Sequence, residues 1–260
     1  MNKVVSIAML TFLACGQVQI VMSESVQAQT NQDRKAEATR LLDLGIKARR
    51  ASQYQNAIES DLNALAICRE LKDRDCEGRA YNGLGLGYYY LGQYDKAIEF
   101  HLQSLTIARE LKDRRGEGQS LGNLGLAYYS LGKYDKAIEF HLQRLAIVRE
   151  IKDRSGEGQS LGNLGLAYNS LGKYDKAIEF QLQSLEIARE IKDRLGEGAA
   201  LGNLGIAYLY LGKYDKAIEY QLQRLAIARE IKDRLGEGQS LGNLGIAYYS
   251  LGKYDKAIEF

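Results

Sequence analysis

Few residues in this chain have side chains suited to catalysis or metal binding. The sequence holds two histidines, His101 and His141, which are forty residues apart. At the same spacing further along the chain, Gln181 and Gln221 stand in place of histidine. A catalytic triad needs a histidine at a fixed place beside a nucleophile, and a metal site needs several converging ligands. A histidine that glutamine replaces meets neither need. We therefore expect no enzymatic activity, no metal and no cofactor here, and interpret both histidines as ordinary polar helix residues.

The three cysteines do not repeat at a spacing that would serve a disulfide framework or a metal site. Cys15 lies in an apolar leader, Cys68 replaces the small residues of later copies, and Cys76 replaces a glycine. A single bridge between Cys68 and Cys76 stays open if the chain reaches an oxidising compartment, because Cys76 falls in a predicted loop.

A block of forty residues dominates the sequence. The copy that starts at Leu121 differs from the copy at Leu161 at eight of forty positions, and looser copies start at Leu41 and Tyr81 in the same register. A period without drift predicts a stacked array, in which each unit buries its apolar surface against its neighbours. We count five full units and part of a sixth, with starts near residues 41, 81, 121, 161, 201 and 241.

Each unit is predicted to contain two helices. Apolar residues from Leu121 to Leu131 fall at i, i+3, i+4, i+7 and i+10, which is typical of one buried helix face. Gly132 suits a left-handed helix end, so a second helix is expected from about Tyr134 to residue 152. Asp153 is the expected N-cap of the next first helix. Such short links place two helices side by side and antiparallel.

The glycine-rich stretch from Gly116 to Gly122 has a superficial likeness to a phosphate-binding loop. No strand is predicted before it, its spacing differs from that of such loops, and every copy repeats it. We therefore predict that this stretch is a turn.

The charge balance gives no reason to expect a polyanionic partner. Lys and Arg total 35 against 33 Asp and Glu, so the formal net charge is +2. This leaves no excess charge for nucleic acid or anionic lipid, and few basic residues lie on the first helices to read RNA. Proline is absent and glycine reaches 27, which favours long helices separated by glycine turns.

Residues 1–28 have the features of a secretory signal peptide. Lys3 precedes an apolar run at residues 4–14, and residues 26–28 offer small side chains around a cleavage point. The run is too short to span a bilayer. We expect export to the periplasm or the extracellular space after cleavage near Ala28. The alternative is a lipoprotein or an N-terminal anchor, because residues 12–16 resemble a lipid-attachment site around Cys15. Only then would the chain contact a membrane.

The residue pattern of the helix pairs resembles that of tetratricopeptide repeats. In the copy at 121 the motif consists of Leu121, Leu124, Gly125, Tyr128, Gly132, Tyr134, Ala137, Ile138 and Leu145. The resemblance covers residues 36–260, after a short polar lead-in at 29–35. It implies an all-α fold, a right-handed solenoid of antiparallel helix pairs. The form with forty residues and no proline is similar to the arrays of kinesin light chains and Pins/LGN adaptors, and to bacterial arrays that precede a caspase-like CHAT domain.

The resemblance implies that the first helices line a concave groove. The groove would contain a ladder of amides at Asn123, Asn163, Asn203 and Asn243. An amide donates and accepts at once, so the ladder could hold the backbone of an extended peptide, as Asn does at this position in the related adaptors. The remaining groove residues would be Leu126, Leu166, Ile206, Ile246, Tyr89, Tyr129, Asn169, Leu209 and Tyr249.

This face has two other interpretations. In the first, which stays open, Asn123 merely bonds neighbouring helices and Leu126 packs beneath them. The second is the carboxylate clamp of chaperone-binding repeats, which is not expected because Gly122 and Leu126 occupy two of its positions.

We therefore predict a non-catalytic scaffold that binds an extended peptide segment of another protein, and neither nucleic acid nor a small-molecule substrate. The alternative is a regulatory or sensing arm of a longer enzyme, with a caspase-like domain downstream of Phe260. Its motivation is that the sequence stops half-way along a second helix, which would leave Leu251, Tyr254 and Ile258 partly uncovered.

Overall fold

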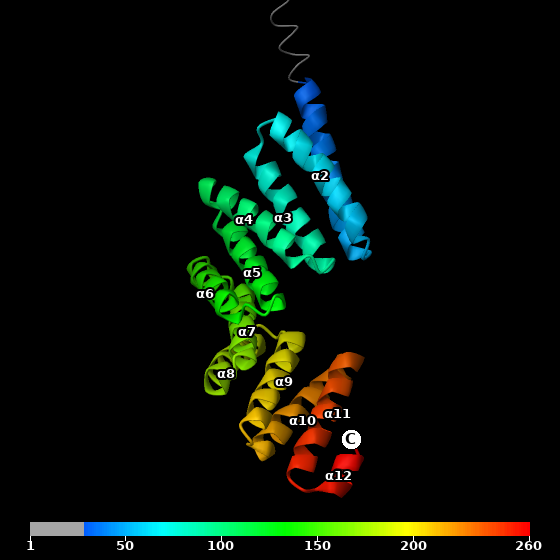
Figure 1. Ribbon diagram of the computed structural model, residues 1–260, viewed down its shortest axis with the longest axis vertical. Coiled ribbons are helices and arrows are strands. Elements are labelled where there is room, and N and C mark those ends of the chain that lie inside the picture. The colour runs from blue at the N-terminus through cyan, green and yellow to red at the C-terminus, as the bar shows by residue number, and fades with distance from the viewer. Residues whose placement is uncertain (1–28) are drawn as a thin grey trace, which may run out of the picture. The chain divides into compact units, whose positions relative to one another are not determined.

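The computed structural model describes residues 29–260, and all regular structure in this range is helical (Figure 1). The first helix covers residues 29–50, so the polar lead-in at 29–35 is part of it. The helices that follow are α2 (Tyr54–Glu70), α3 (Arg74–Tyr90), α4 (Tyr94–Glu110), α5 (Arg114–Ser130), α6 (Tyr134–Glu150), α7 (Arg154–Ser170), α8 (Tyr174–Glu190), α9 (Arg194–Tyr210), α10 (Tyr214–Glu230), α11 (Arg234–Ser250) and α12 (Tyr254–Ile258). The predicted signal peptide, Cys15 included, lies outside the described residues.

The described chain forms two compact units. Unit 1 comprises residues 29–91, and unit 2 comprises Gly92–Phe260. Within unit 2 each helix packs against the next one along the chain, from α4 to α12. The prediction of an all-α solenoid built from antiparallel helix pairs is confirmed.

The links within a pair and between successive pairs follow the predicted chemistry. Gly132 has φ 72°, the left-handed conformation that ends a helix, and its equivalents up to Gly252 share it. Asp135 lies in the first turn of α6, where its charge meets the positive end of the helix dipole. Asp153 accepts a hydrogen bond from the Gly156 amide at 2.9 Å, so its predicted role as an N-cap is confirmed.

The prediction of a turn at the glycine-rich stretch was wrong, because residues 116–122 lie inside α5. The glycines there serve close packing instead of chain reversal. A Cβ on Gly118 would lie 3.3 Å from Ile147 Cγ2, and a Cβ on Gly122 would lie 2.9 Å from Arg144 Cδ. Glycine inside a helix costs about 1 kcal/mol relative to alanine, and here it allows α6 to approach α5 closely.

The second helix also ends earlier than predicted. It stops at Glu150, and Lys152 adopts φ 58°. The amide of Asp153 donates to the carbonyl of Val148 at 2.8 Å, which closes the turn. A left-handed lysine therefore ends the second helix, where the sequence predicted that the helix would continue.

The core repeats with the block. Leu121 and Leu124 from α5 and Leu145 from α6 are buried. The ring of Tyr128 stacks on that of Phe140 at 5.2 Å, and the equivalent pair Tyr168 and Phe180 stacks at 5.3 Å. These contacts bury the stripes that the sequence periodicity predicted.

The interpretation of His101 and His141 as ordinary polar helix residues was wrong, because both are fully buried. Their position lies one turn from Ala137 and one turn from Leu145, on the apolar stripe. The His141 ring lies against α5, where a Cβ on Gly125 would fall 2.5 Å from it. Burial lowers the pKa of both imidazoles to about 4. In later copies Gln181 and Gln221 are buried at this position, which we call the buried polar position.

In unit 1 the buried polar position holds Asp61, which is fully buried and pairs with Arg49. Burial raises the pKa of Asp61 to about 6, against the opposing effect of the Arg49 charge. The bridge that the sequence left open is present: Cys68 and Cys76 form a disulfide with a Cα–Cα distance of 5.5 Å. It joins the end of α2 to the beginning of α3.

Candidate functional site

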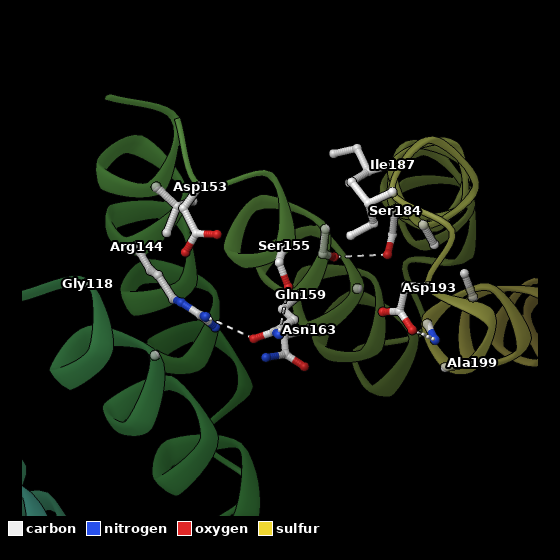
Figure 2. A pocket seen from close by; sticks show the side chains of 18 of the residues that line it. Gly118, Arg144, Asp153, Ser155, Gln159, Asn163, Ser184, Ile187, Asp193 and Ala199 are labelled. Atoms are coloured by element: carbon white, nitrogen blue, oxygen red, sulfur yellow. Dashed lines mark hydrogen bonds between the residues drawn. The ribbon is translucent and has the colours of Figure 1, made fainter. Parts of the chain in front are cut away.

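A cavity of about 660 Å³ lies in unit 2 and is lined by α5, α7 and α9 with parts of α6 and α8 (Figure 2). We call it the central groove. It brings together five of the predicted site residues: Asn123, Asn163, Asn203, Leu126 and Leu166. All five are half-buried, so part of each side chain faces the open side of the cavity.

The other predicted residues do not line this cavity. Ile206 is half-buried, whereas Ile246 and Tyr249 are 52% and 65% exposed. Asn243 is half-buried on α11, and Leu209 packs against the core. The structure thus divides the predicted surface into a groove and separate surface positions.

The aromatic positions of the predicted surface contact other side chains. The Tyr129 hydroxyl shares a hydrogen bond with Ser170 Oγ at 3.0 Å. Asn169 keeps a buried Oδ1 without a partner. Tyr89 belongs to unit 1 and meets Tyr90 edge-on at 5.5 Å. These residues therefore vary between copies without forming one shared surface.

The sequence analysis did not assign to the groove the residues that come from second helices or from the beginning of first helices. Figure 2 shows Arg144 pointing from α6 towards Gln159 and Asn163. Ser155 and Ser184 also line the cavity. Arg144, Ser155 and Gln159 are among the eight positions that differ between the copies at 121 and 161, and this variation is the signal that could have found them.

The polar groups of the groove are only partly satisfied. Arg144 Nη2 donates to Gln159 Oε1 at 3.0 Å, but its buried Nε has no acceptor. Burial lowers the pKa of the Arg144 guanidinium, and the nearby Asp153 charge opposes the shift. Gln181 Nε2 donates to the Gly162 carbonyl at 2.9 Å, while its Oε1 has no partner. The groove therefore offers hydrogen-bonding groups next to apolar surface.

Within residues 29–260 no group of three or more His, Cys, Asp or Glu side chains could hold a metal ion. In the same range, no helix is both long enough and apolar enough to cross a bilayer. The lining of the groove combines amides and hydroxyls with the side chains of Arg115 and Arg144, two aspartates and two leucines.

The chain belongs to the tetratricopeptide repeat family. One profile of this family, described as tetratricopeptide repeat, matches residues 36–110, 77–150 and 156–230, and a second with the same description matches residues 203–260. The resemblance predicted from the motif residues is confirmed. Members of this family are generally non-catalytic and serve as scaffolds for protein interactions.

Solved structures show the same fold. The tetratricopeptide sensor protein of the STAND ATPase class from Pyrococcus horikoshii aligns with TM-score 0.77 and 20% identity, over 89% of this chain and 36% of that one. This chain thus spans about a third of that protein. Aspartyl phosphate phosphatase F from Bacillus subtilis aligns with TM-score 0.74 and 18% identity, over 93% of this chain and 72% of that one.

A putative kinesin light chain of Podospora anserina, described as having nearly identical repeats, aligns with TM-score 0.65 and 22% identity over 76% of this chain and 98% of its own. No curated protein matches this chain in a sequence comparison.

Proposed function

We propose that this chain is a non-catalytic scaffold that binds an extended peptide segment of a partner protein in the central groove. The observation that carries the proposal is the row of amides: Asn123, Asn163 and Asn203 line one cavity, one repeat apart. An extended peptide presents a donor and an acceptor at every residue, and amides satisfy both. The partner is a protein, with no nucleic acid and no small-molecule substrate.

Two of the three amides, those of Asn163 and Asn203, are not consumed by the fold. Asn163 and Asn203 make no side-chain hydrogen bond with other residues of the described chain, although both are half-buried. This argues against the interpretation in which the ladder merely bonds neighbouring helices. Leu126 and Leu166 add apolar surface next to the amides, where side chains of a bound segment would lose water.

The test is a selection from a library of random fifteen-residue peptides displayed on phage. The immobilised chain is expected to enrich a set of peptides, and the Asn123→Ala/Asn163→Ala/Asn203→Ala variant is expected to lose them. The matched control is Gln103→Ala/Gln143→Ala/Gln183→Ala, which removes three amides from second helices outside the cavity. Equal enrichment by both variants would remove the ladder from the account.

We also propose that the chain is exported, with cleavage near Ala28, or is held as a lipoprotein through Cys15. The disulfide between Cys68 and Cys76 supports this location, because such bonds persist in oxidising compartments. Cell fractionation with thiol labelling tests it. We expect unlabelled Cys68 and Cys76 in the exported fraction, and labelled thiols in the cytoplasmic fraction would contradict export.

A second candidate function is the sensing arm of a larger protein, with a caspase-like domain downstream as one form of it. The specific observation is the similarity to the STAND protein, whose repeats are described as a sensor and of which this chain spans 36%. Reading the gene beyond the codon for Phe260 tests it. A stop codon at that point would exclude this candidate.

A further inference from the structure

Most arginines of unit 2 that lie near the helix ends belong to ion pairs. Arg149 Nε pairs with Glu157 Oε1 at 2.7 Å, and Arg154 Nε donates to Glu190 Oε1 at 3.1 Å. The same arrangement recurs one repeat on, where Arg189 pairs with Glu197 at 2.8 Å. These pairs join the first and second helices along one edge of the repeats, and their charges are matched.

Two half-buried arginines that line cavities, which we call the groove arginines, are different; Arg115 also lines the central groove but is exposed. Arg144 and Arg224 each donate to one glutamine, Gln159 and Gln239, and neither forms an ion pair with a carboxylate of the described chain. Arg144 lines the central groove, and Arg224 lines a second cavity of about 190 Å³ that is two repeats further on. Both guanidinium groups are therefore partly buried and form no ion pair within residues 29–260.

The fold does not need arginine at this position. The equivalent residues of the intervening copies are Ser104 and Ser184. Ser184 Oγ donates to the Gly158 carbonyl at 2.9 Å, and Ser104 Oγ bonds Ser120 Oγ at 3.0 Å. The second helix is seventeen residues long in a repeat with serine and in a repeat with arginine. Serine and arginine thus alternate in an otherwise constant framework.

The side chain of each groove arginine lies along a glycine of the first helix. A Cβ on Gly122 would fall 2.9 Å from Arg144 Cδ, and a Cβ on Gly202 would fall 2.7 Å from Arg224 Cδ. Against Gly162, which faces a serine, the only close atom is Ser184 Oγ at 3.3 Å. Because glycine has no side chain, the aliphatic part of the arginine lies directly against the first helix. The guanidinium is therefore positioned before any ligand binds.

From these observations we propose that Arg144 and Arg224 bind carboxylate side chains of one peptide, which lies in the central groove and extends into the second cavity. The two cavities share Ala199 in their lining. The proposal rests on the proposed function and names its specificity: a segment with Asp or Glu residues. Arginine matches a carboxylate with two parallel hydrogen bonds, and burial strengthens the attraction. A neutral carbonyl could accept the same donors but would leave the buried charge uncompensated.

The nearby acidic residues form no ion pair with these arginines, although the Asp153 and Asp233 charges oppose the lowering of the Arg144 and Arg224 pKa by burial. Asp153 and Asp193 also line the groove, and each caps a helix by accepting a hydrogen bond from a backbone amide at 2.9 Å. Asp233, which lies in the second cavity with Arg224, caps α11 in the same way at 3.0 Å. Each of these carboxylates is engaged at a helix end and does not accept from an arginine of the described chain, so the remaining arginine donors stay available.

The experiment repeats the peptide selection with a composition readout. The peptides are fused to the phage coat through their C-terminus, so every carboxylate in the random region is a side chain. The native chain is expected to enrich Asp and Glu at fixed positions. The Arg144→Ser/Arg224→Ser variant, which restores the residue of the neighbouring copies, is expected to lose this preference and to bind the selected acidic peptides at least about tenfold more weakly.

A gain-of-function variant guards against loss of folding. Ser184→Arg/Ala199→Gln recreates the Arg144 and Gln159 pair in the next repeat, over Gly162, and is expected to add one further acidic position. Peptides enriched without acidic preference, or a preference that survives Arg144→Ser/Arg224→Ser, would overturn the inference and leave peptide binding standing. Failure of the native chain to enrich any peptide would overturn both proposals.

Discussion

The two units place different chemistry at the same position of the repeat. In unit 1 the buried polar position holds an ionised Asp61 with Arg49 as its partner. In unit 2 it holds histidine or glutamine, and neither ring nitrogen of the buried His101 has a hydrogen-bond partner in the described chain. In each case the side chain faces a glycine of the first helix, as Gly45 faces Asp61 and Gly125 faces His141. The packing of the repeat buries the side chain at this position. Among the described residues, a charged side chain occurs there only in unit 1, where Arg49 pairs with it.

The comparison extends to the joints between helices. Unit 1 ties α2 to α3 with the bond between Cys68 and Cys76, whereas unit 2 has Ala108 and Gly116 at the equivalent positions. A Cβ added to Gly116 would lie 3.5 Å from Ala108 Cβ, so the ends of α4 and α5 lie close together without a covalent bond. Unit 1 is held by specific partners, and unit 2 by repeated close packing, which leaves its groove side chains free to vary.

The largest expected effect is the loss of the charge in unit 1. Arg49→Leu leaves the fully buried Asp61 without its cation and should destabilise unit 1 by roughly 3 kcal/mol. Arg49→Leu/Asp61→Gln, which copies Leu209 and Gln221 of a later repeat, should recover most of this loss. Hydrogen exchange of amides in residues 29–91 measures both. Equal destabilisation by the single and double variants would show that the pair is not the cause.

Reduction of the disulfide should have the next largest effect. The bridge closes a loop with a sequence separation of 8, and loop-closure entropy gives about 2.5 kcal/mol for a loop of this size. Dithiothreitol should therefore speed exchange in unit 1 and leave α5 to α10 unchanged. Cys68→Ala/Cys76→Gly, which copies Ala108 and Gly116, should lack any response to the reductant. Faster exchange across unit 2 would contradict a local effect.

The two units should respond to acid with opposite signs. The pKa of His141 is about 4 in the folded state and 6.5 when unfolded, so its contribution is complete above pH 6.5 and is lost as the pH falls towards 4. The pKa of Asp61 is about 6 when folded and 3.8 when unfolded, so protonation at pH 5 favours folded unit 1.

Between pH 7 and pH 5, unit 2 should lose roughly 2 kcal/mol per histidine, whereas unit 1 should gain roughly 1 kcal/mol. Hydrogen exchange at the two pH values, corrected for the intrinsic rate, separates the units. His101→Gln/His141→Gln copies the later repeats and should abolish the loss in unit 2. A loss that persists in this variant would place its cause elsewhere.

The smallest effect concerns the left-handed turn. Ser52 has φ 58° where Gly92 and Gly132 have φ 73° and 72°. Ser52→Gly should stabilise unit 1 by about 0.5–1 kcal/mol, because glycine adopts this conformation without a Cβ penalty. The reverse change in unit 2, Gly132→Ser, should cost a similar amount. Urea unfolding of the two variants measures both, and shifts of the same sign would contradict the explanation.

The fold followed from the sequence because two local signals repeat five times. The period of forty and the apolar spacing from Leu121 to Leu131 determine the helix pairs, and Gly132 marks their turn. The glycine-rich stretch at 116–122 was misread, because glycine in a single sequence looks the same whether it ends a helix or admits a neighbour. The burial of His141 was missed for a related reason, since its polarity concealed its place on the apolar stripe.

The candidate site was only half accessible to sequence reasoning. Asn123, Asn163 and Asn203 share a repeat position, and periodicity alone predicts that they form a row. Arg144 comes from the second helix, and its approach to the groove depends on how α6 crosses α5 over Gly122. Such an approach is a tertiary fact, which the pattern of one helix does not contain.

The most direct test of the central claim is the affinity of one selected peptide for the native chain and for Asn123→Ala/Asn163→Ala/Asn203→Ala, measured by fluorescence anisotropy. With three amides removed, the account predicts a dissociation constant roughly a hundredfold higher and an unchanged unfolding midpoint. Gln103→Ala/Gln143→Ala/Gln183→Ala should bind as the native chain does. An affinity that is equal for all three proteins would contradict peptide binding by the asparagine row.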